Sequence, residues 1–175
     1  ELLTRNADEI ARRAGRPLRV THASVRNPDR ARGLPAEVAL HTDPFAVVRQ
    51  ADVDIVAELI GGIEPARELI LAAIGAGKHV VTANKALIAH HGNEIFEAAR
   101  RAGVAVGFEA AVAGGIPVIK TLREGLAGNR IDGIAGIING TSNYILTQMR
   151  DAGLDFATAL ADAQRLRSEE HTSEL

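Results

Sequence analysis

Short apolar strand patterns alternate with helix patterns along most of this chain, and this alternation limits the fold more than any other feature. The predicted strands span 18–25, 54–60, 79–82 and 104–108. The helices predicted between them span 44–50, 65–75 and 85–103. Asp43 is the expected N-cap of the first helix, and continuous apolar residues predict that the strand at 54–60 is buried on both faces. Strands joined by helices through short loops predict an α/β fold, a parallel sheet with flanking helices.

The pattern changes near residue 115, where we place the boundary between two domains. Beyond it, the sequence predicts a helix from Pro117 to about residue 125 and an alternating strand over 131–138. Two helices that end near Leu166 follow. We therefore predict a first domain over 1–115 and the beginning of a second, α+β domain over 116–166.

The sequence at both ends suggests that the chain is a fragment of a longer protein. Residues 1–14 have a loose apolar helical face and no starting methionine, so we expect that further chain precedes them. Residues 167–175 are polar and do not continue the helical pattern before them. We interpret 167–175 as a non-native tail, with a natural polar tail as the alternative.

The composition excludes several classes of protein. With 46% hydrophobic and 24% charged residues, the chain is globular in composition. A net charge of -2 and 3% aromatic residues argue against a nucleic-acid partner. The absence of cysteine excludes disulfides and thiolate metal sites. No apolar run approaches the roughly 20 residues that span a membrane. We predict a cytoplasmic protein with neither a nucleic-acid nor a membrane partner.

Ligands of open parallel sheets bind beyond the carboxyl ends of the strands, and two candidate segments are predicted to lie there. Gly61 and Gly62 follow the strand at 54–60, and without Cβ atoms they let a ligand approach the backbone. A simple tight turn explains them equally well. Lys85 enters the first turn of a helix, where a cation opposes the helix dipole. Its ammonium could reach a phosphate, a ribose hydroxyl or a substrate carbonyl, unless it is a solvated surface lysine.

Two further segments carry weaker patterns. Glu109, followed by flexible backbone as far as Pro117, could hold a hard cation through oxygen atoms, although an interdomain hinge fits the same residues. Arg26 follows the first strand, with Arg30 and Arg32 close behind. An arginine there favours the 2′-phosphate of NADP, and solvated surface arginines are the alternative. The histidines are scattered and receive no role.

Four segments, in this order along the chain, resemble the homoserine dehydrogenase family. They are 53–62 (VDIVAELIGG), 77–87 (GKHVVTANKAL), 108–120 (FEAAVAGGIPVIK) and 138–146 (INGTSNYIL). The resemblance covers residues 1 to about 166. It implies a Rossmann-like nucleotide domain and a substrate domain that dimerises, so that the parent protein is a homodimer or homotetramer. The implied activity is the NAD(P)-dependent interconversion of L-homoserine and L-aspartate 4-semialdehyde, a step toward threonine, methionine and isoleucine.

The resemblance also implies roles for particular residues. The cofactor, NADP or NAD, would lie against Ile60, Gly61, Gly62, Asn84 and Lys85. Lys85 would lie near the nicotinamide and the substrate and supply part of the catalytic electrostatics. A sodium site would be formed by the Glu109 carboxylate and the backbone oxygens of Val112, Gly114 and Ile116. The substrate side of the cleft would begin at Asn139, Gly140, Thr141 and Ser142.

The chain departs from the family pattern at both ends. The resemblance implies that a glycine-rich fingerprint precedes residue 1, and that a substrate-binding glutamate, an acidic cluster and a proton-donating lysine follow Leu166. We therefore predict that this chain by itself is inactive or nearly so. Two alternatives stay open: a non-catalytic nucleotide-binding or interaction module on the same scaffold, and another Rossmann semialdehyde or amino-acid dehydrogenase.

Overall fold

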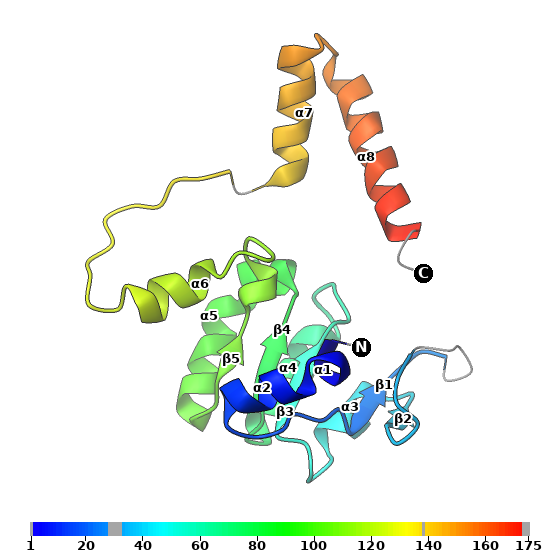
Figure 1. Ribbon diagram of the computed structural model, residues 1–175, viewed down its shortest axis with the longest axis vertical. Coiled ribbons are helices and arrows are strands. Elements are labelled where there is room, and N and C mark those ends of the chain that lie inside the picture. The colour runs from blue at the N-terminus through cyan, green and yellow to red at the C-terminus, as the bar shows by residue number, and fades with distance from the viewer. Residues whose placement is uncertain (1, 28–32, 138, 173–175) are drawn as a thin grey trace. The chain divides into compact units, whose positions relative to one another are not determined.

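The structure of the chain is a computed structural model, which describes residues 2–27, 33–137 and 139–172, with side chains described as far as residue 166. The chain divides into two compact units, residues 1–120 and 121–175 (Figure 1). The predicted domain boundary, residue 115, lies five positions before the division at 120. In the described part of the chain, all strands belong to the first unit.

A three-stranded parallel sheet with the order β3-β4-β5 lies in the first unit. Its strands are β3 (Ile55–Glu58), β4 (His79–Thr82) and β5 (Val106–Gly107). Glu58 pairs with Thr82, the last residues of β3 and β4. These strands confirm the predictions at 54–60, 79–82 and 104–108, with β3 and β5 shorter than predicted. Because the strands are parallel, the segments that follow β3 and β4 leave the sheet at the same edge.

A second, two-stranded parallel sheet is formed by β1 (His22–Ser24) and β2 (Ala39–His41). β1 confirms only the end of the strand predicted at 18–25, and β2 was not predicted. Among the described residues no strand connects β1 to β3, so the predicted single sheet is present as two sheets. In a doubly wound sheet the two halves meet through one central strand, and without such a strand each half pairs only within itself.

The predicted helices of the first unit are confirmed as α3 (Pro44–Val48), α4 (Ala66–Gly75) and α5 (Lys85–Ala102). Asp43 caps α3 as predicted, since its side chain accepts a hydrogen bond from the amide of Phe45 at 2.9 Å. Gly103, with a φ of 68°, ends α5 in the left-handed conformation that glycine adopts at least cost. The shorter elements of this unit are α1 (Leu2–Arg5), α2 (Ala7–Ala14), η1 (Glu109–Ala111) and α6 (Val118–Lys120).

The core of the first unit lies between the three-stranded sheet and the pair α4 and α5 (Figure 1). Its most buried large side chains are Ile70, Leu87, Ile95 and Val80. Alternate residues of β3 and β4 point toward this core, so Val56 is buried while Ile55 is 46% exposed. The prediction that the strand at 54–60 is buried on both faces is therefore wrong. Helices cover one face of this strand, and its outer residues stay accessible in the described part of the chain.

The second unit consists of helices: η2 (Thr121–Gly125), which continues α6 as a π-helix, α7 (Gly140–Asp151) and α8 (Phe156–Thr172). α7 packs against α8 around Ile145, Ala159 and Ala163. These elements confirm the helix predicted from Pro117 to 125 and the two helices after residue 139. The backbone of α8 continues past the predicted end at Leu166 to Thr172, because no glycine or proline interrupts the chain there.

The strand predicted over 131–138 is not formed. Residues 131–137 have no regular secondary structure, and Ile138 lies outside the described residues. The apolar members of the pattern are exposed, with Ile134 at 69% and Ile137 at 77%. A strand needs a neighbour to bond its backbone groups, and the described part of the second unit supplies none.

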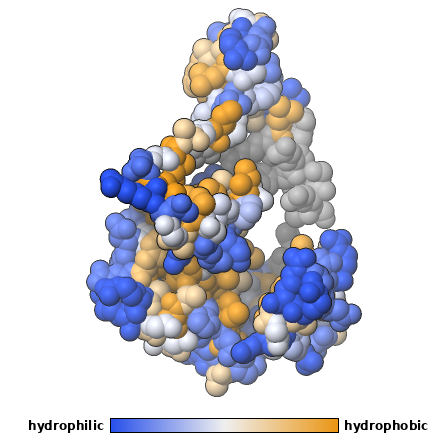
Figure 2. Space-filling model, turned by 60° about the vertical axis from the view of Figure 1, so that its left-hand side comes forward, coloured by the Kyte–Doolittle hydropathy of each residue, from blue (hydrophilic) through white to orange (hydrophobic). Residues whose placement is uncertain are grey.

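Apolar side chains reach the surface of both units (Figure 2). On the first unit they include Ile55, Leu59, Ile60 and Val81, and on the second Ile134, Ile137 and Leu146. Within the described ranges, none of the helices combines the length and apolar character needed to cross a membrane.

Candidate functional site

The strongest candidate site lies at the edge where β3 and β4 end. The chain leaves β3 through Ile60, Gly61 and Gly62, and it leaves β4 through Asn84 and Lys85. A hydrogen bond from Asn84 Nδ2 to the carbonyl oxygen of Gly62 joins the two exits. The structure therefore brings together five of the residues that the sequence singled out for a cofactor.

The turn after β3 requires its two glycines. Gly61 and Gly62 have φ values of 78° and 73°, in the left-handed region where an L side chain is strained. A Cβ atom built on either residue would meet no atom within 4 Å. The glycines therefore serve the backbone conformation, and the space beside the turn is open to a ligand.

Asn84 has a structural role at this edge. It is the N-cap of α5, where its Oδ1 accepts a hydrogen bond from the amide of Leu87 at 3.1 Å. The same side chain donates to Gly62, and the residue is only 8% exposed. Asn84 thus fixes the distance between the glycine turn and the start of α5, with both ends of its amide occupied by the protein.

Lys85 is the first residue of α5 and is exposed. Its ammonium has no hydrogen bond or ion pair with any residue in the described ranges. A cation at a helix N-terminus is unfavourable by some tenths of a kcal/mol, so nothing local stabilises lysine at this position. The side chain is available to a negatively charged or polar ligand beside the glycine turn.

Glu58 is a residue of this edge that the sequence reasoning missed. It ends β3, is fully buried, and accepts hydrogen bonds from the amides of Ile60 at 2.7 Å and Gly61 at 3.2 Å. It also accepts from the hydroxyl of Thr82 at 2.7 Å. The available signal was a charged residue inside the apolar run IVAELI, immediately before the glycine turn.

The segment predicted to hold a cation is tied to α6. The two carboxylate oxygens of Glu109 accept hydrogen bonds from the amides of Ile119 at 2.9 Å and Lys120 at 3.1 Å. The carbonyl oxygen of Ile116 accepts from Val118 at 2.8 Å. Glu109 therefore caps the first turn of α6. A carboxylate offers about four lone-pair positions, so these two bonds leave acceptor capacity for a cation.

The remaining predicted residues belong to other parts of the chain. Arg26 is exposed in the loop after β1, which belongs to the two-stranded sheet, and it makes no hydrogen bond or ion pair within the described residues. Arg30 and Arg32 lie outside the described residues. Asn139 to Ser142 belong to the second unit, where Asn139 caps α7 by accepting from the amide of Ser142 at 2.8 Å.

A cavity of about 590 Å³ occurs elsewhere in the first unit. Its walls come from α1, α2, β1 and β2 and the segments beside them, and include Leu3, Leu18, Val20, His22, Ala39 and Asp52. None of the residues predicted to bind cofactor, cation or substrate lines it. It therefore adds nothing to the site at the end of β3 and β4.

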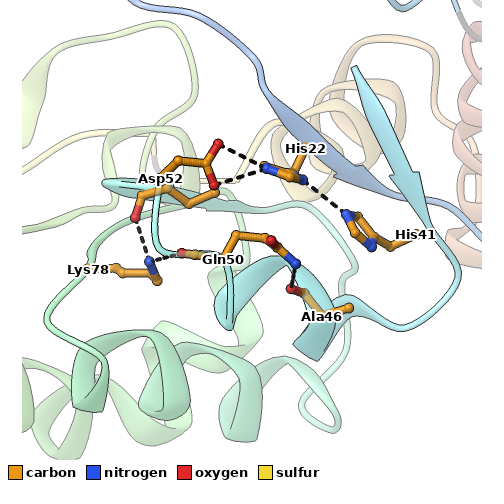
Figure 3. Close-up of polar contacts among 7 residues, drawn as sticks. His22, His41, Ala46, Gln50, Asp52 and Lys78 are labelled. Carbon is orange, nitrogen blue, oxygen red and sulfur yellow. Dashed lines mark hydrogen bonds and ion pairs between the residues drawn. The ribbon is translucent and has the colours of Figure 1, made fainter. Parts of the chain in front are cut away.

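Two histidines, to which the sequence assigned no role, form a hydrogen-bonded chain with Asp52 (Figure 3). His22 and Asp52 also line the cavity. His22 lies between His41 and Asp52, with its Nδ1 3.0 Å from His41 Nε2 and its Nε2 3.1 Å from Asp52 Oδ2. Below them, the ammonium of Lys78 donates to the carbonyl oxygens of Gln50 and Val53, both at 2.6 Å. This chain of contacts ties β1 and β2 to the loop before β3. The sequence could not predict these contacts, because His22, His41 and Asp52 are 19 and 30 positions apart and form no local pattern.

We expect the bond between His22 and Asp52 to make the first unit less stable in acid. The hydrogen bond from His22 holds the pKa of Asp52 below its usual range. A carboxyl whose pKa is lowered by folding stabilises the fold above about pH 4, and that stabilisation disappears as the pH falls through the folded pKa. Denaturant unfolding of the first unit across this range, compared between the unsubstituted chain and Asp52→Asn, measures the effect. The variant should lose less stability on acidification.

Asp54→Asn is the matched control, because Asp54 is exposed and has no side-chain partner among the described residues. The control should follow the unsubstituted chain. Equal acid sensitivity in Asp52→Asn and the unsubstituted chain would show that the bond contributes nothing.

Two family models match the chain one after the other. The model described as "Homoserine dehydrogenase, NAD binding domain" matches residues 1–109, and the model described as "Homoserine dehydrogenase" matches residues 117–174. The homoserine dehydrogenase of Pseudomonas aeruginosa is 58% identical over 165 residues, which are 94% of this chain and 38% of that protein.

Solved structures agree with the sequence matches. The crystal structure of a homoserine dehydrogenase from Thiobacillus denitrificans superposes with a TM-score of 0.86 and 63% identity, over 94% of this chain and 38% of that one. A hyperthermophilic archaeal homoserine dehydrogenase in complex with NADPH superposes with a TM-score of 0.66 and 28% identity, over 92% of this chain and 46% of that one.

The parallel sheet, its flanking helices and the match over residues 1–109 define the first unit as a Rossmann-like, NAD-binding type of domain. The chain belongs to the homoserine dehydrogenase family. It spans somewhat more than a third of the length of the relatives that it matches, 38% of the Pseudomonas protein.

Proposed function

We propose that this chain is a piece of a homoserine dehydrogenase that carries its nucleotide-binding domain and the beginning of its substrate domain. The whole protein then interconverts L-homoserine and L-aspartate 4-semialdehyde with NADP or NAD, on the route to threonine, methionine and isoleucine. The observation that carries the proposal is the edge of the sheet, where the open glycine turn at Gly61 and Gly62 lies beside Lys85, in a chain of this family.

The geometry fits a nicotinamide nucleotide. The cofactor supplies hydride transfer to or from the substrate carbon. The glycine turn lets its backbone approach the nucleotide, since no Cβ atom stands in the way. Lys85 starts α5 directly after Asn84, which bonds Gly62, and from there its ammonium would stabilise negative charge that develops on the substrate oxygen. Arg26 is the candidate for a 2′-phosphate, and the exposed residues Asn139, Gly140, Thr141 and Ser142 are the candidates for the substrate side.

We also propose a monovalent cation, sodium, at Glu109 and the carbonyl oxygens of Val112, Gly114 and Ile116. Carboxylate and carbonyl oxygens are the ligands that hard cations prefer. The remaining acceptor capacity of Glu109 supports the site, and the left-handed residues Ala113 and Gly115 bend the backbone between these carbonyls. The cation would order the loop between η1 and α6.

The test uses a hybrid enzyme, in which residues 1–166 replace the matching segment of the Pseudomonas aeruginosa relative. We expect the hybrid to oxidise L-homoserine with NADP or NAD, measured by the appearance of reduced nicotinamide. This chain alone should give no turnover with either nucleotide. The Pseudomonas enzyme itself is the positive control, and titration with both nucleotides reports which one is preferred.

A folded hybrid without turnover on L-homoserine with either nucleotide would overturn the proposal. Nucleotide binding by such a hybrid, without turnover, would favour a non-catalytic module. Turnover of a different amino-acid or semialdehyde substrate would favour another dehydrogenase. Assays with sodium and with choline as the only monovalent cation test the cation separately, because choline is too large for a cage of protein oxygens.

A further inference from the structure

We propose that Glu58 is a positioning residue that couples the Gly61–Gly62 turn to Lys85. The inference rests on the proposed nucleotide site, because it explains how the two parts of that site are held together. Glu58 itself is fully buried, so it cannot touch a ligand at the edge of the sheet. Its effect must pass through the groups that it bonds.

Glu58 occupies a place where an apolar residue would be expected. It ends a strand whose other inward residue is Val56, and burying a carboxylate is costly unless donors satisfy it. In the described part of the chain, its partners are two backbone amides and one hydroxyl, and no lysine or arginine pairs with it. The carboxylate therefore holds three neutral donors in place. Its burial costs desolvation free energy, which an exposed charged pair does not lose.

The bonds of Glu58 close a ring around the candidate site. One oxygen accepts from the amide of Gly61, and the other accepts from the hydroxyl of Thr82. Thr82 Oγ1 in turn accepts from the amide of Asn84 at 3.0 Å, and the side chain of Asn84 donates to the carbonyl of Gly62. One ring of hydrogen bonds thus joins the turn after β3 to the N-terminus of α5.

The ring determines the position of Lys85 at the start of α5. Glu58, Thr82 and Asn84 are each at most 8% exposed, and hydrogen bonds in such a low-dielectric setting reinforce one another. Lys85 follows Asn84 directly, so the first turn of α5 can shift against the glycine turn only if the ring opens. A misplacement of about 1 Å costs roughly 100-fold in rate when reacting groups must be aligned.

The kinetic test breaks one link of the ring in the hybrid enzyme. Glu58→Gln keeps an oxygen for the two amides but reverses and weakens the bond to Thr82, whose hydroxyl must then accept from an NH₂ group instead of donating to a charged oxygen. Thr82→Val removes the hydroxyl between Glu58 and Asn84 altogether. Each variant should lower kcat about tenfold and leave the KM for the nucleotide within about twofold, because the turn is kept and Lys85 is displaced. The double variant should be no slower than the slower single variant, since both break the same link.

A second measurement uses amide hydrogen exchange on this chain, without any activity. In Glu58→Gln and Thr82→Val, the amides of Asn84 and Leu87 should exchange faster, while those of α4 keep their rates. Glu97→Gln is the control for both measurements, because Glu97 is exposed on α5 and, among the residues that the structure describes, pairs only with arginines of its own helix.

The outcomes separate this inference from the proposed function. An unsubstituted hybrid without turnover contradicts the proposed function, and the exchange pattern then still decides whether Glu58 couples the turn to α5. An active hybrid whose Glu58→Gln and Thr82→Val variants both keep their kcat overturns the inference alone. Faster exchange spread evenly over the whole first unit would also overturn it, because it would mean that Glu58 contributes only global stability.

Discussion

Replacing Lys85 by methionine is expected to lower kcat/KM of the hybrid enzyme by about two orders of magnitude, the usual effect of removing a group that stabilises negative charge in a transition state. Lys85 is exposed at the first turn of α5, directly after the residue that bonds the glycine turn, and no described residue pairs with its ammonium. Methionine keeps the length and the apolar stem but removes the charge. Steady-state kinetics with L-homoserine and the preferred nucleotide measure the change.

Arg101→Met provides the matched control for this experiment. Arg101 lies in the last turn of the same helix, 65% exposed, so its loss removes an equal charge far from the candidate site. The control should keep the rate of the unsubstituted hybrid. A Lys85→Met variant that also keeps its rate to within about threefold would assign Lys85 to the solvated surface, because removal of a stabilising group costs far more.

Shortening Ile70 to alanine is expected to lower the free energy of unfolding of the first unit by about 3 kcal/mol. Ile70 lies on α4, is fully buried, and belongs to the core between the sheet and the helices. Its truncation removes apolar contacts and leaves a cavity that the neighbouring helix and strand can fill only in part. The most slowly exchanging amides of β4 and α4 report this free energy without interference from the second unit.

Leu59→Ala serves as the comparison for Ile70→Ala, since Leu59 is 77% exposed directly after β3. Its truncation should change the stability by less than about 0.5 kcal/mol. Equal effects of the two substitutions would contradict the assignment of the core to the face of the sheet that α4 and α5 cover.

The elements predicted with success are those whose signals are local. Asp43 precedes α3 and caps it, the apolar run at 79–82 is β4, and Gly103 ends α5. Each of these features depends on neighbouring residues only, through a side chain that bonds the adjacent backbone or a conformation that glycine adopts readily. The turn at Gly61 and Gly62 and the helix that begins at Lys85 were predicted for the same reason, because each follows a predicted strand within three residues.

The predictions that failed depended on partners distant in the sequence. The alternation at 131–137 is real, but without a neighbouring strand in the described residues its backbone does not form a sheet. The strand at 54–60 was expected to be buried on both faces, yet burial depends on which face the helices cover. β2, only three residues long, carries no pattern of its own and forms because β1 pairs with it.

The alternation of β3, β4 and β5 with α4 and α5, the ends of these helices and the glycine turn were determined by the sequence itself, because periodicity, caps and backbone preferences act over a few residues. Only the tertiary structure decided that Glu58, Thr82 and Asn84 form one ring, and that His22 joins His41 to Asp52. These contacts connect residues that are 24 and 30 positions apart in the longest cases, and chain folding alone brings such groups within bonding distance.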